Sequence, residues 1–156
     1  MVAVLIAALA LAFAPTGART YTIQLDRLLA PTVNGHQIAN ERDAAHVFGA
    51  PTTRSRCTAA WKQATLSLNT CGIGAELAAT APSWRTAKGL HPGDTAARAH
   101  ALYPQGGSLG FLDRGTLWQL ETGGAMCDGG PTLALAAKLA AGRVVALEVV
   151  RVPACG

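Results

Sequence analysis

The chain has 156 residues, with 13 Lys and Arg against 9 Asp and Glu and a formal net charge of +4. This length suits one domain with a single hydrophobic core. The basic residues are spread along the sequence, and only Arg54 and Arg56 lie close together, so the charge pattern is that of a solvated surface and not of a nucleic-acid footprint.

The N-terminal segment has the outline of an export signal. Residues 2–14 carry no charged or strongly polar side chain, and small residues follow up to Ala18. The apolar run is shorter than the roughly 20 residues that a membrane-spanning helix needs. We expect residues 1–18 to be a signal peptide, although its start lacks Lys and Arg, and whether it is cleaved or anchors the protein stays open. Residues 19–156 are then a single domain that is secreted, periplasmic or on the exterior of the cell envelope, with no stable membrane span.

A short amphipathic helix is the first clear element after this segment. Residues 21–25 are a strand candidate and residues 26–30 a candidate helical turn, and neither signal is decisive. Asn40 is a good helix N-cap, and Asp43 follows three residues later, as in a capping box. The apolar spacing that begins there predicts a helix that ends at Gly49.

Two alternating strands follow, joined by a turn at residues 62–65. In this register Cys71 lies one residue beyond the position that faces Cys57. An even number of cysteines behind an export signal, with no C-x-x-C pair, is typical of disulfides and not of a metal site. Four cysteines allow three connectivities, and the register favours a bond between Cys57 and Cys71.

The next stretch, residues 72–92, is predicted to be a loop-rich connection. A second helix then begins at residues 93–95 with Asp94 as its cap. It ends at Tyr103, because the following proline disfavours helical geometry in the residue before it. Strand-like residues resume at 116–121.

The C-terminal sequence predicts a β-hairpin. A three-residue loop at residues 140–142, with its glycine in the left-handed conformation, places Leu135 opposite Leu147 and makes one side wholly apolar. The same register, continued outward, brings Cys127 opposite Cys155. We therefore expect a second disulfide between these two cysteines.

One order of elements occurs twice along the chain: a capped short helix, then antiparallel strands with a central tryptophan. This indicates a degenerate internal repeat, with copies at residues 35–74 and 89–152. The predicted fold class is α+β, with two short helices packed on an antiparallel sheet.

Short motifs in both copies resemble a known bacterial family. The segment VFGAP at residues 47–51 is followed by Trp61, and GLHPGDT at residues 89–95 leads to LYP at residues 102–104. These segments resemble small exported bacterial domains with the β-lactamase inhibitory protein fold, which the outer-membrane assembly lipoproteins of the SmpA and OmlA type share. The resemblance implies a helical pair packed on a small antiparallel sheet, with tandem copies forming a concave binding face.

Two departures from that family limit what the resemblance implies. No cysteine stands at the predicted cleavage point, so the lipid anchor of the assembly lipoproteins is absent. Tight protein interfaces depend on aromatic anchors, and most aromatic residues of this chain already have predicted core positions. Inhibition of a secreted enzyme is therefore an alternative function and not the leading one.

The sharpest catalytic pattern is GGSLG at residues 106–110, which matches the G-x-S-x-G nucleophile elbow. That elbow joins a strand to a helix, whereas a helix end precedes Ser108 here, and the chain is too small for an α/β-hydrolase. A flexible glycine loop is the favoured interpretation. A small hydrolase that uses Ser108 is the enzymatic alternative.

No other group of residues predicts chemistry. The histidines, namely His36, His46, His91 and His100, show no metal-site or catalytic spacing, and those on the predicted helices face solvent. Residues 72–74 lack the third glycine and the helix of a dinucleotide site. We predict no catalytic, metal or cofactor site.

Trp84 and Arg85 form the candidate recognition patch, because a large aromatic and a cation lie together in a connector rich in proline and serine. The competing interpretation is that Trp84 closes over the sheet as a loop anchor. The leading function is a non-enzymatic binding or structural domain of the bacterial envelope. In it, a sheet face or the loop at residues 82–92 holds an unknown protein or a cell-envelope polymer.

Overall fold

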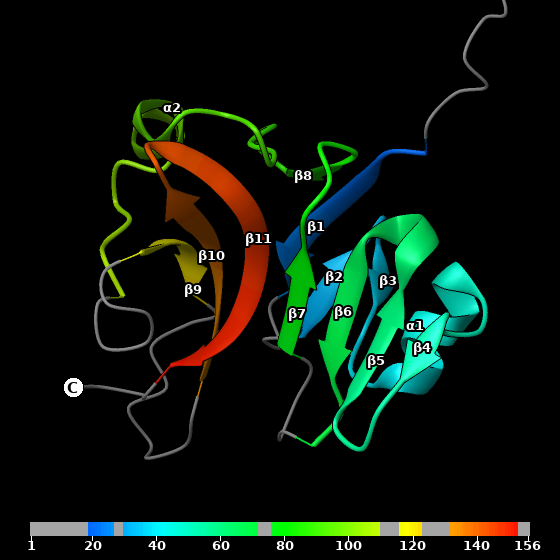
Figure 1. Ribbon diagram of the computed structural model, residues 1–156. Coiled ribbons are helices and arrows are strands. Elements are labelled where there is room, and N and C mark those ends of the chain that lie inside the picture. Colours follow the sequence, from blue (N-terminus) through cyan, green and yellow to red (C-terminus); the bar gives the residue numbers. More distant parts are fainter. Residues whose placement is uncertain (1–18, 27–29, 72–75, 110–115, 123–131, 153–156) are drawn as a thin grey trace, which may run out of the picture.

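The computed structural model describes residues 19–26, 30–71, 76–109, 116–122 and 132–152. Within these residues the fold is α+β, as predicted, but it contains two sheets and not one. The smaller sheet contains β1 (Tyr21–Leu25), β2 (Pro31–Val33), β3 (His36–Gln37) and β8 (Trp84–Thr86), in the order β3-β2-β1-β8. Its partner is a seven-stranded sheet, and the smaller sheet lies behind it in Figure 1.

The larger sheet has the order β4-β5-β6-β7-β11-β10-β9. Its strands are β4 (Thr53–Arg54), β5 (Thr58–Trp61), β6 (Leu66–Asn69), β7 (Glu76–Ala79), β9 (Leu117–Thr122), β10 (Thr132–Ala140) and β11 (Arg143–Val152). Every neighbouring pair in it is antiparallel. A short 3-10 helix, η1 (Lys62–Ala64), joins β5 to β6.

The smaller sheet starts from a tight hairpin between β2 and β3. Its loop is Asn34-Gly35, and both residues have positive φ values, 50° and 81°. Asn-Gly is favoured in two-residue hairpin loops because both central residues need that conformation. The prediction omitted this hairpin, although the dipeptide was its signal. β1 then pairs with β2 on one side and, in parallel, with β8 on the other.

The first helix, α1 (Glu41–Phe48), confirms the prediction at both ends. The Asn40 side chain accepts hydrogen bonds from two backbone N–H groups of the first turn, and the helix ends at Gly49 with φ 80°. Asp43 Oδ2 accepts from the Ala39 N–H at 2.9 Å. Such caps satisfy N–H groups that have no partner within the helix.

The second helix, α2 (Ala96–Leu102), begins one residue later than predicted. Its cap is Thr95, which accepts from the Arg98 N–H at 3.1 Å, and not Asp94. Asp94 instead accepts from the His91 N–H at 3.0 Å and closes the preceding turn. The helix ends at Tyr103, as predicted. In the described part of the chain, neither helix has the length and apolar character needed to cross a membrane.

The β5–β6 hairpin has the predicted register, with Thr58 opposite Asn69. Cys57 and Cys71 therefore lie side by side, and they form a disulfide with a Cα–Cα distance of 4.8 Å. The predicted Cys127–Cys155 pair lies outside the described residues.

The predicted loop at residues 72–92 is wrong in its central part, because it contains β7 and β8. β7 lies between β6 and β11 in the larger sheet and pairs with both. Its sequence, Glu-Leu-Ala-Ala, consists mainly of weak strand formers. The strand forms because β6 and β11 supply hydrogen-bond partners on both sides. No local sequence pattern predicts this pairing.

The C-terminal hairpin forms, but its register differs from the prediction by two residues. The loop has two residues, Ala141-Gly142, with φ values of 47° and 74°, and an irregularity follows between Lys138 and Leu139. Leu135 consequently faces Val149 and not Leu147. Because side chains alternate with period two, Leu133, Leu135, Leu147 and Val149 stay on the same side of the hairpin, whereas Val145 at the irregularity is 40% exposed.

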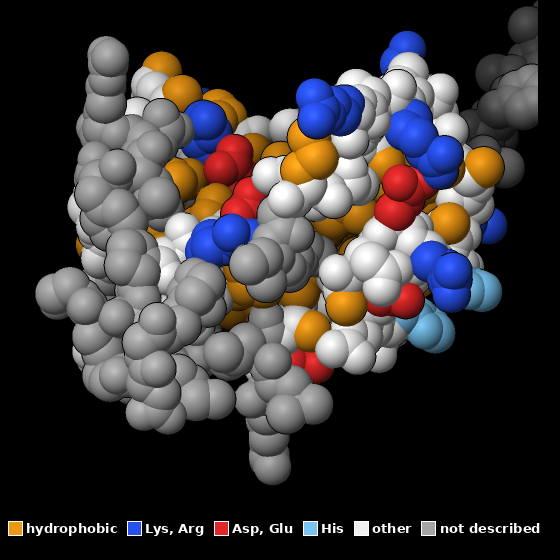
Figure 2. All heavy atoms as spheres, turned by 90° about the horizontal axis from the view of Figure 1, so that it is seen from below, with side chains coloured by type: hydrophobic (Ala, Val, Ile, Leu, Met, Phe, Trp, Pro, Cys, Tyr) orange, Lys and Arg blue, Asp and Glu red, His pale blue; other side chains and the backbone are white. Residues whose placement is uncertain are grey.

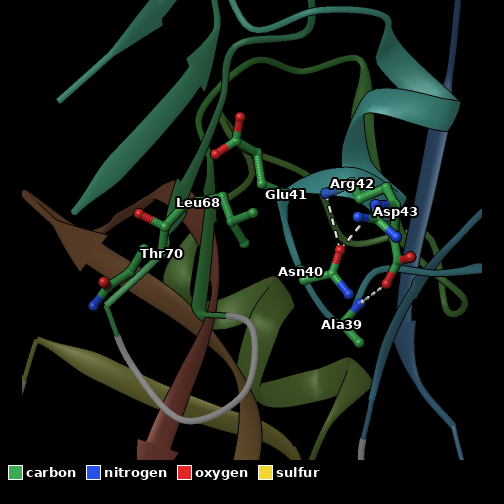
Figure 3. Close-up of a pocket in the computed structure, with 8 residues that line it drawn as sticks. Ala39, Asn40, Glu41, Arg42, Asp43, Leu68 and Thr70 are labelled. Atoms are coloured by element: carbon green, nitrogen blue, oxygen red, sulfur yellow. Dashed lines mark hydrogen bonds between the residues drawn. The ribbon is translucent and has the colours of Figure 1, made fainter. Parts of the chain in front are cut away.

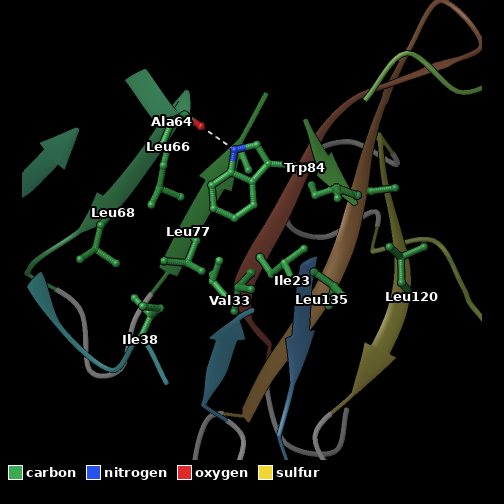
Figure 4. Close-up of a cluster of buried hydrophobic side chains, with 14 of the residues drawn as sticks. Ile23, Val33, Ile38, Ala64, Leu66, Leu68, Leu77, Trp84, Leu120 and Leu135 are labelled. Atoms are coloured by element: carbon green, nitrogen blue, oxygen red, sulfur yellow. Dashed lines mark hydrogen bonds between the residues drawn. The ribbon is translucent and has the colours of Figure 1, made fainter. Parts of the chain in front are cut away.

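The core lies between the two sheets (Figure 4). Strand alternation directs one set of leucines from the larger sheet toward Ile23 and Val33 of the smaller one. Tyr21 stacks on Trp84, with ring centroids 4.8 Å apart, and Phe48 of α1 lies 5.8 Å from the same indole. Phe48 also lies 6.2 Å from the ring of Trp61 in β5, so aromatic rings join the smaller sheet, the first helix and the larger sheet.

Two parts of the chain follow the same order of elements in the larger sheet. After α1 come β4, β5, β6 and β7; after α2 come residues 107–109, β9, β10 and β11. β4 pairs with β5 at one edge, and Ser108 bridges to Trp118 of β9 at the other, while β7 and β11 meet between the two parts. β7 lies beyond residue 74, the predicted end of the first copy, and the repeat at residues 35–74 and 89–152 stays a prediction.

Candidate binding surfaces

The larger sheet has a second face, which points away from the main core. We call it the outer face and define it by alternate residues of β5, β6, β7 and β11: Thr58, Ala60, Ser67, Asn69, Glu76, Ala78, Glu148 and Val150. One row crosses four strands in register, with Ala60 beside Ser67, Ser67 beside Ala78, and Ala78 beside Glu148. These small side chains leave the backbone of rigid strands open to a partner.

A cavity of about 360 Å³ opens on the outer face. It extends from Thr58 and the Cys57–Cys71 disulfide across Ser67 and Ala78 to Glu148. Figure 2 looks at the protein from below the view of Figure 1 and shows a hollowed surface with hydrophobic side chains inside and acidic and basic groups beside them. Residues on several strands form this hollow, so its shape depends on the sheet and not on a loop.

Charged groups at the outer face are held in ion pairs. Glu76 lies 3.5 Å from Arg151, and it also accepts a hydrogen bond from Asn69 Nδ2 at 2.9 Å. Glu148 lies 3.8 Å from Lys138. All four charged side chains are partly exposed, so the outer face offers both signs of charge in fixed positions.

A cavity of about 540 Å³ lies at the start of α1 (Figure 3). Three of its polar side chains have partners within the protein. Asn40 and Asp43 make the capping hydrogen bonds, and Glu41 forms an ion pair with Arg54. These three side chains therefore serve the start of the helix and an ion pair within the protein.

The predicted patch of Trp84 and Arg85 does not form, because the structure separates the two side chains. Trp84 is 0% exposed, and its indole N–H donates to the Ala64 carbonyl. Arg85 is exposed on the other side of β8, where its Nε donates to Thr22 Oγ1 at 3.3 Å. Strand alternation sends neighbouring residues to opposite faces. The buried position of Trp84 agrees with the competing interpretation, in which this side chain anchors the connection to the sheet.

The loop at residues 82–92 is likewise tied to the body of the protein. Leu90 is buried, and its N–H donates to Thr86 Oγ1 at 3.2 Å. Immediately after the loop, the Gly93 N–H donates to the Val144 carbonyl at 2.7 Å, which fixes the connection beside the tip of β10–β11. The outer face is thus the better candidate of the two surfaces that the sequence proposed.

Ser108 is exposed and lies in an extended segment that pairs with β9. Within the part of the chain that the structure describes, no hydrogen bond joins Ser108 to a histidine. His100 contacts the Trp118 ring instead, with centroids 4.1 Å apart. A serine nucleophile needs a base within hydrogen-bond reach, and the described residues do not place one there.

Gly106, the first glycine of the GGSLG segment, is explained by packing. A Cβ atom at this position would lie 2.2 Å from the Gln119 carbonyl oxygen and 2.6 Å from Trp118 Nε1, whereas at Gly107 nothing lies within 4 Å. Gly106→Ala is expected to destabilise the protein by about 1–3 kcal/mol through this clash. Gly107→Ala, the matched control, is expected to change stability by less than about 1 kcal/mol. Urea unfolding of both variants measures the difference, and equal effects would refute the packing explanation.

The histidines lie in three different places in the fold. His91 Nδ1 lies 3.0 Å from the Pro92 carbonyl oxygen, and its Nε2 is 3.6 Å from Asp94. His36 and His46 line one groove of about 460 Å³ together with Arg19. No group of three or more metal-ligating side chains occurs among the residues described.

Burial raises the pKa of Tyr103 above its ordinary value, so this phenol stays neutral.

Comparisons with protein-family models, with curated proteins and with solved structures gave no match. The function therefore has to be argued from the surfaces of this chain. Of these, the outer face combines a hollow, small side chains and fixed charges on neighbouring strands of one sheet.

Proposed function

We propose that the protein is a secreted, non-enzymatic binding domain of the bacterial cell envelope, and that its outer face holds a protein or a cell-envelope polymer. The observation that carries this proposal is the hollow over β5, β6, β7 and β11, which is lined by small side chains and flanked by two ion pairs. Sites on strands keep their geometry better than sites on loops, which favours recognition of a partner by shape.

Two further features support an exported binding domain. The disulfide between Cys57 and Cys71 borders the hollow, and Cys71 is exposed. Exposed structural disulfides are typical of oxidising compartments. The N-terminal segment with the outline of an export signal agrees with such a compartment.

Filling the hollow is the direct test of this function. Ser67→Arg and Ala78→Arg each place a long side chain on the outer face and are expected to weaken partner binding at least about tenfold, since an obstructed interface loses its central contacts. Binding is measured as co-sedimentation with envelope fragments of the producing organism and as capture of its exported proteins.

Two controls make this test specific. Ala97→Arg adds the same side chain to an exposed position of α2 and is expected to leave binding unchanged. Glu76→Gln and Glu148→Gln alter the same face without adding volume, and thermal unfolding confirms that each variant is folded. Full binding by both folded arginine variants on the outer face would show that the partner lies elsewhere.

A further inference from the structure

A second groove lies on another part of the protein, where the start of β1 meets the β2–β3 hairpin and the last turn of α1. Its volume is about 460 Å³, and its lining includes Arg19, Tyr21, Asn34, His36 and His46. We call it the N-terminal groove. Its walls come from segments that are separated in sequence, and the pairing of β1 with β2 and β2 with β3 brings them together.

The charge of the N-terminal groove is one-sided. Arg19, His36 and His46 are basic and exposed, and no carboxylate belongs to the lining. The acidic residues of α1 are engaged elsewhere, since Asp43 accepts from the Ala39 N–H and Glu41 pairs with Arg54. An anion that enters the groove meets the Arg19 guanidinium and two imidazoles, and no carboxylate of the lining competes with it.

Some of the basic residues elsewhere in the protein are engaged in ion pairs. Arg54, Arg98, Lys138 and Arg151 each form an ion pair with an acidic side chain. Within the described ranges, the three basic side chains of the N-terminal groove make no ion pair and no side-chain hydrogen bond. Their donor groups are therefore available to a ligand.

The wall behind these donors is rigid. The Asn34 Oδ1 accepts from the Thr22 N–H at 2.7 Å, and its Nδ2 donates to the Thr20 carbonyl at 3.4 Å. The Tyr21 ring packs against Phe48 and Trp84, with centroids 5.4 and 4.8 Å away. A groove with a fixed wall loses little conformational entropy when it binds a ligand.

We propose that the N-terminal groove binds the phosphate group of an anionic phosphodiester, from either a polymer or a lipid headgroup. A guanidinium donates a fork of N–H groups that matches phosphate oxygens, and each imidazole adds an N–H donor. The volume is within the usual range of small-molecule sites, so a phosphate enters together with part of the chain that carries it. This site is separate from the outer face and does not depend on the function proposed for it.

The test titrates the purified protein with an oligomer of glycerol phosphate at fixed ionic strength and follows binding by calorimetry and by the NMR signals of His36 and His46. Arg19→Gln combined with His36→Gln and His46→Gln is expected to weaken binding at least about tenfold, because charge-assisted hydrogen bonds are lost. Arg56→Gln combined with Lys62→Gln removes two exposed charges outside the groove and is expected to weaken it less than about twofold.

The source of the phosphate is distinguished by a second arm with phosphatidylcholine vesicles that contain or lack phosphatidylglycerol. Binding to the oligomer alone assigns a phosphodiester polymer, and binding only to the anionic vesicles assigns a lipid headgroup. Binding to neither overturns the proposal. Equal weakening by the two sets of variants, or equal affinity for polyglutamate, also overturns it, because attraction would then follow net charge and not phosphate recognition.

Discussion

Replacing Trp84 with alanine is expected to destabilise the protein by about 3–5 kcal/mol, the usual cost of removing a large aromatic side chain from a core. The indole is 0% exposed, stacks on Tyr21 and donates a hydrogen bond to the Ala64 carbonyl. Its loss would open a cavity between the sheets and leave that carbonyl without its partner. Chemical denaturation followed by circular dichroism measures the change.

Arg85→Ala is the matched control, because it alters the next residue of the same strand. Its side chain is exposed and makes one hydrogen bond, to Thr22. The expected change is within about 0.5 kcal/mol. Similar losses in the two variants would mean that β8 itself, and not the buried indole, determines stability at this position.

Removal of the Cys57–Cys71 disulfide by a double replacement with serine is expected to cost about 3 kcal/mol. The two cysteines are 14 residues apart, and closing a loop of this size lowers the entropy of the unfolded chain by about that amount in free energy. The loss should appear as a lower urea midpoint with a steeper slope, because the unfolded chain is less compact and more exposed without the cross-link.

Amide hydrogen exchange in the same variant provides a second measurement for this prediction. If the disulfide acts on the unfolded chain, the native hairpin should retain its hydrogen bonds, and amide exchange in β5 and β6 should become faster only in proportion to the global loss. Stability within about 1 kcal/mol of the wild type would contradict the entropic explanation.

Features fixed by local chemistry were predictable from sequence. Asn40 and Gly49 bound the first helix because a side-chain acceptor and a left-handed glycine are needed at those ends. The Cys57–Cys71 pair followed from alternation across one hairpin. In each case the decisive residues lie within about 15 positions of one another.

Features that depend on distant partners were not predictable. β7 carries two alanines and pairs with β11, about 70 residues later in the chain. β8 reaches the smaller sheet only through parallel pairing with β1. The error of two residues in the last hairpin has two local causes. Ala141 adopts a positive φ that alanine rarely takes, which shortens the loop by one residue, and the irregularity between Lys138 and Leu139 shifts the register by one more.

The candidate surfaces were likewise predictable only where they depend on local sequence and not on distant strand pairing. The sequence indicated a sheet face in general terms, because alternation predicts one apolar and one polar side. It did not place Ser67, Ala78 and Glu148 in one row, since that requires the pairing of β7. Nor did it join His36 to His46, because the hairpin that carries His36 was not among the predicted elements.

The junction of β7 with β11 has a consequence for assembly. Each of these strands ends one part of the larger sheet, and each completes its hydrogen bonds on a strand from the other part. Two molecules that open this junction at high concentration present matching strand edges to each other. Reciprocal exchange of the C-terminal parts would then give a domain-swapped dimer with the contacts of the monomer.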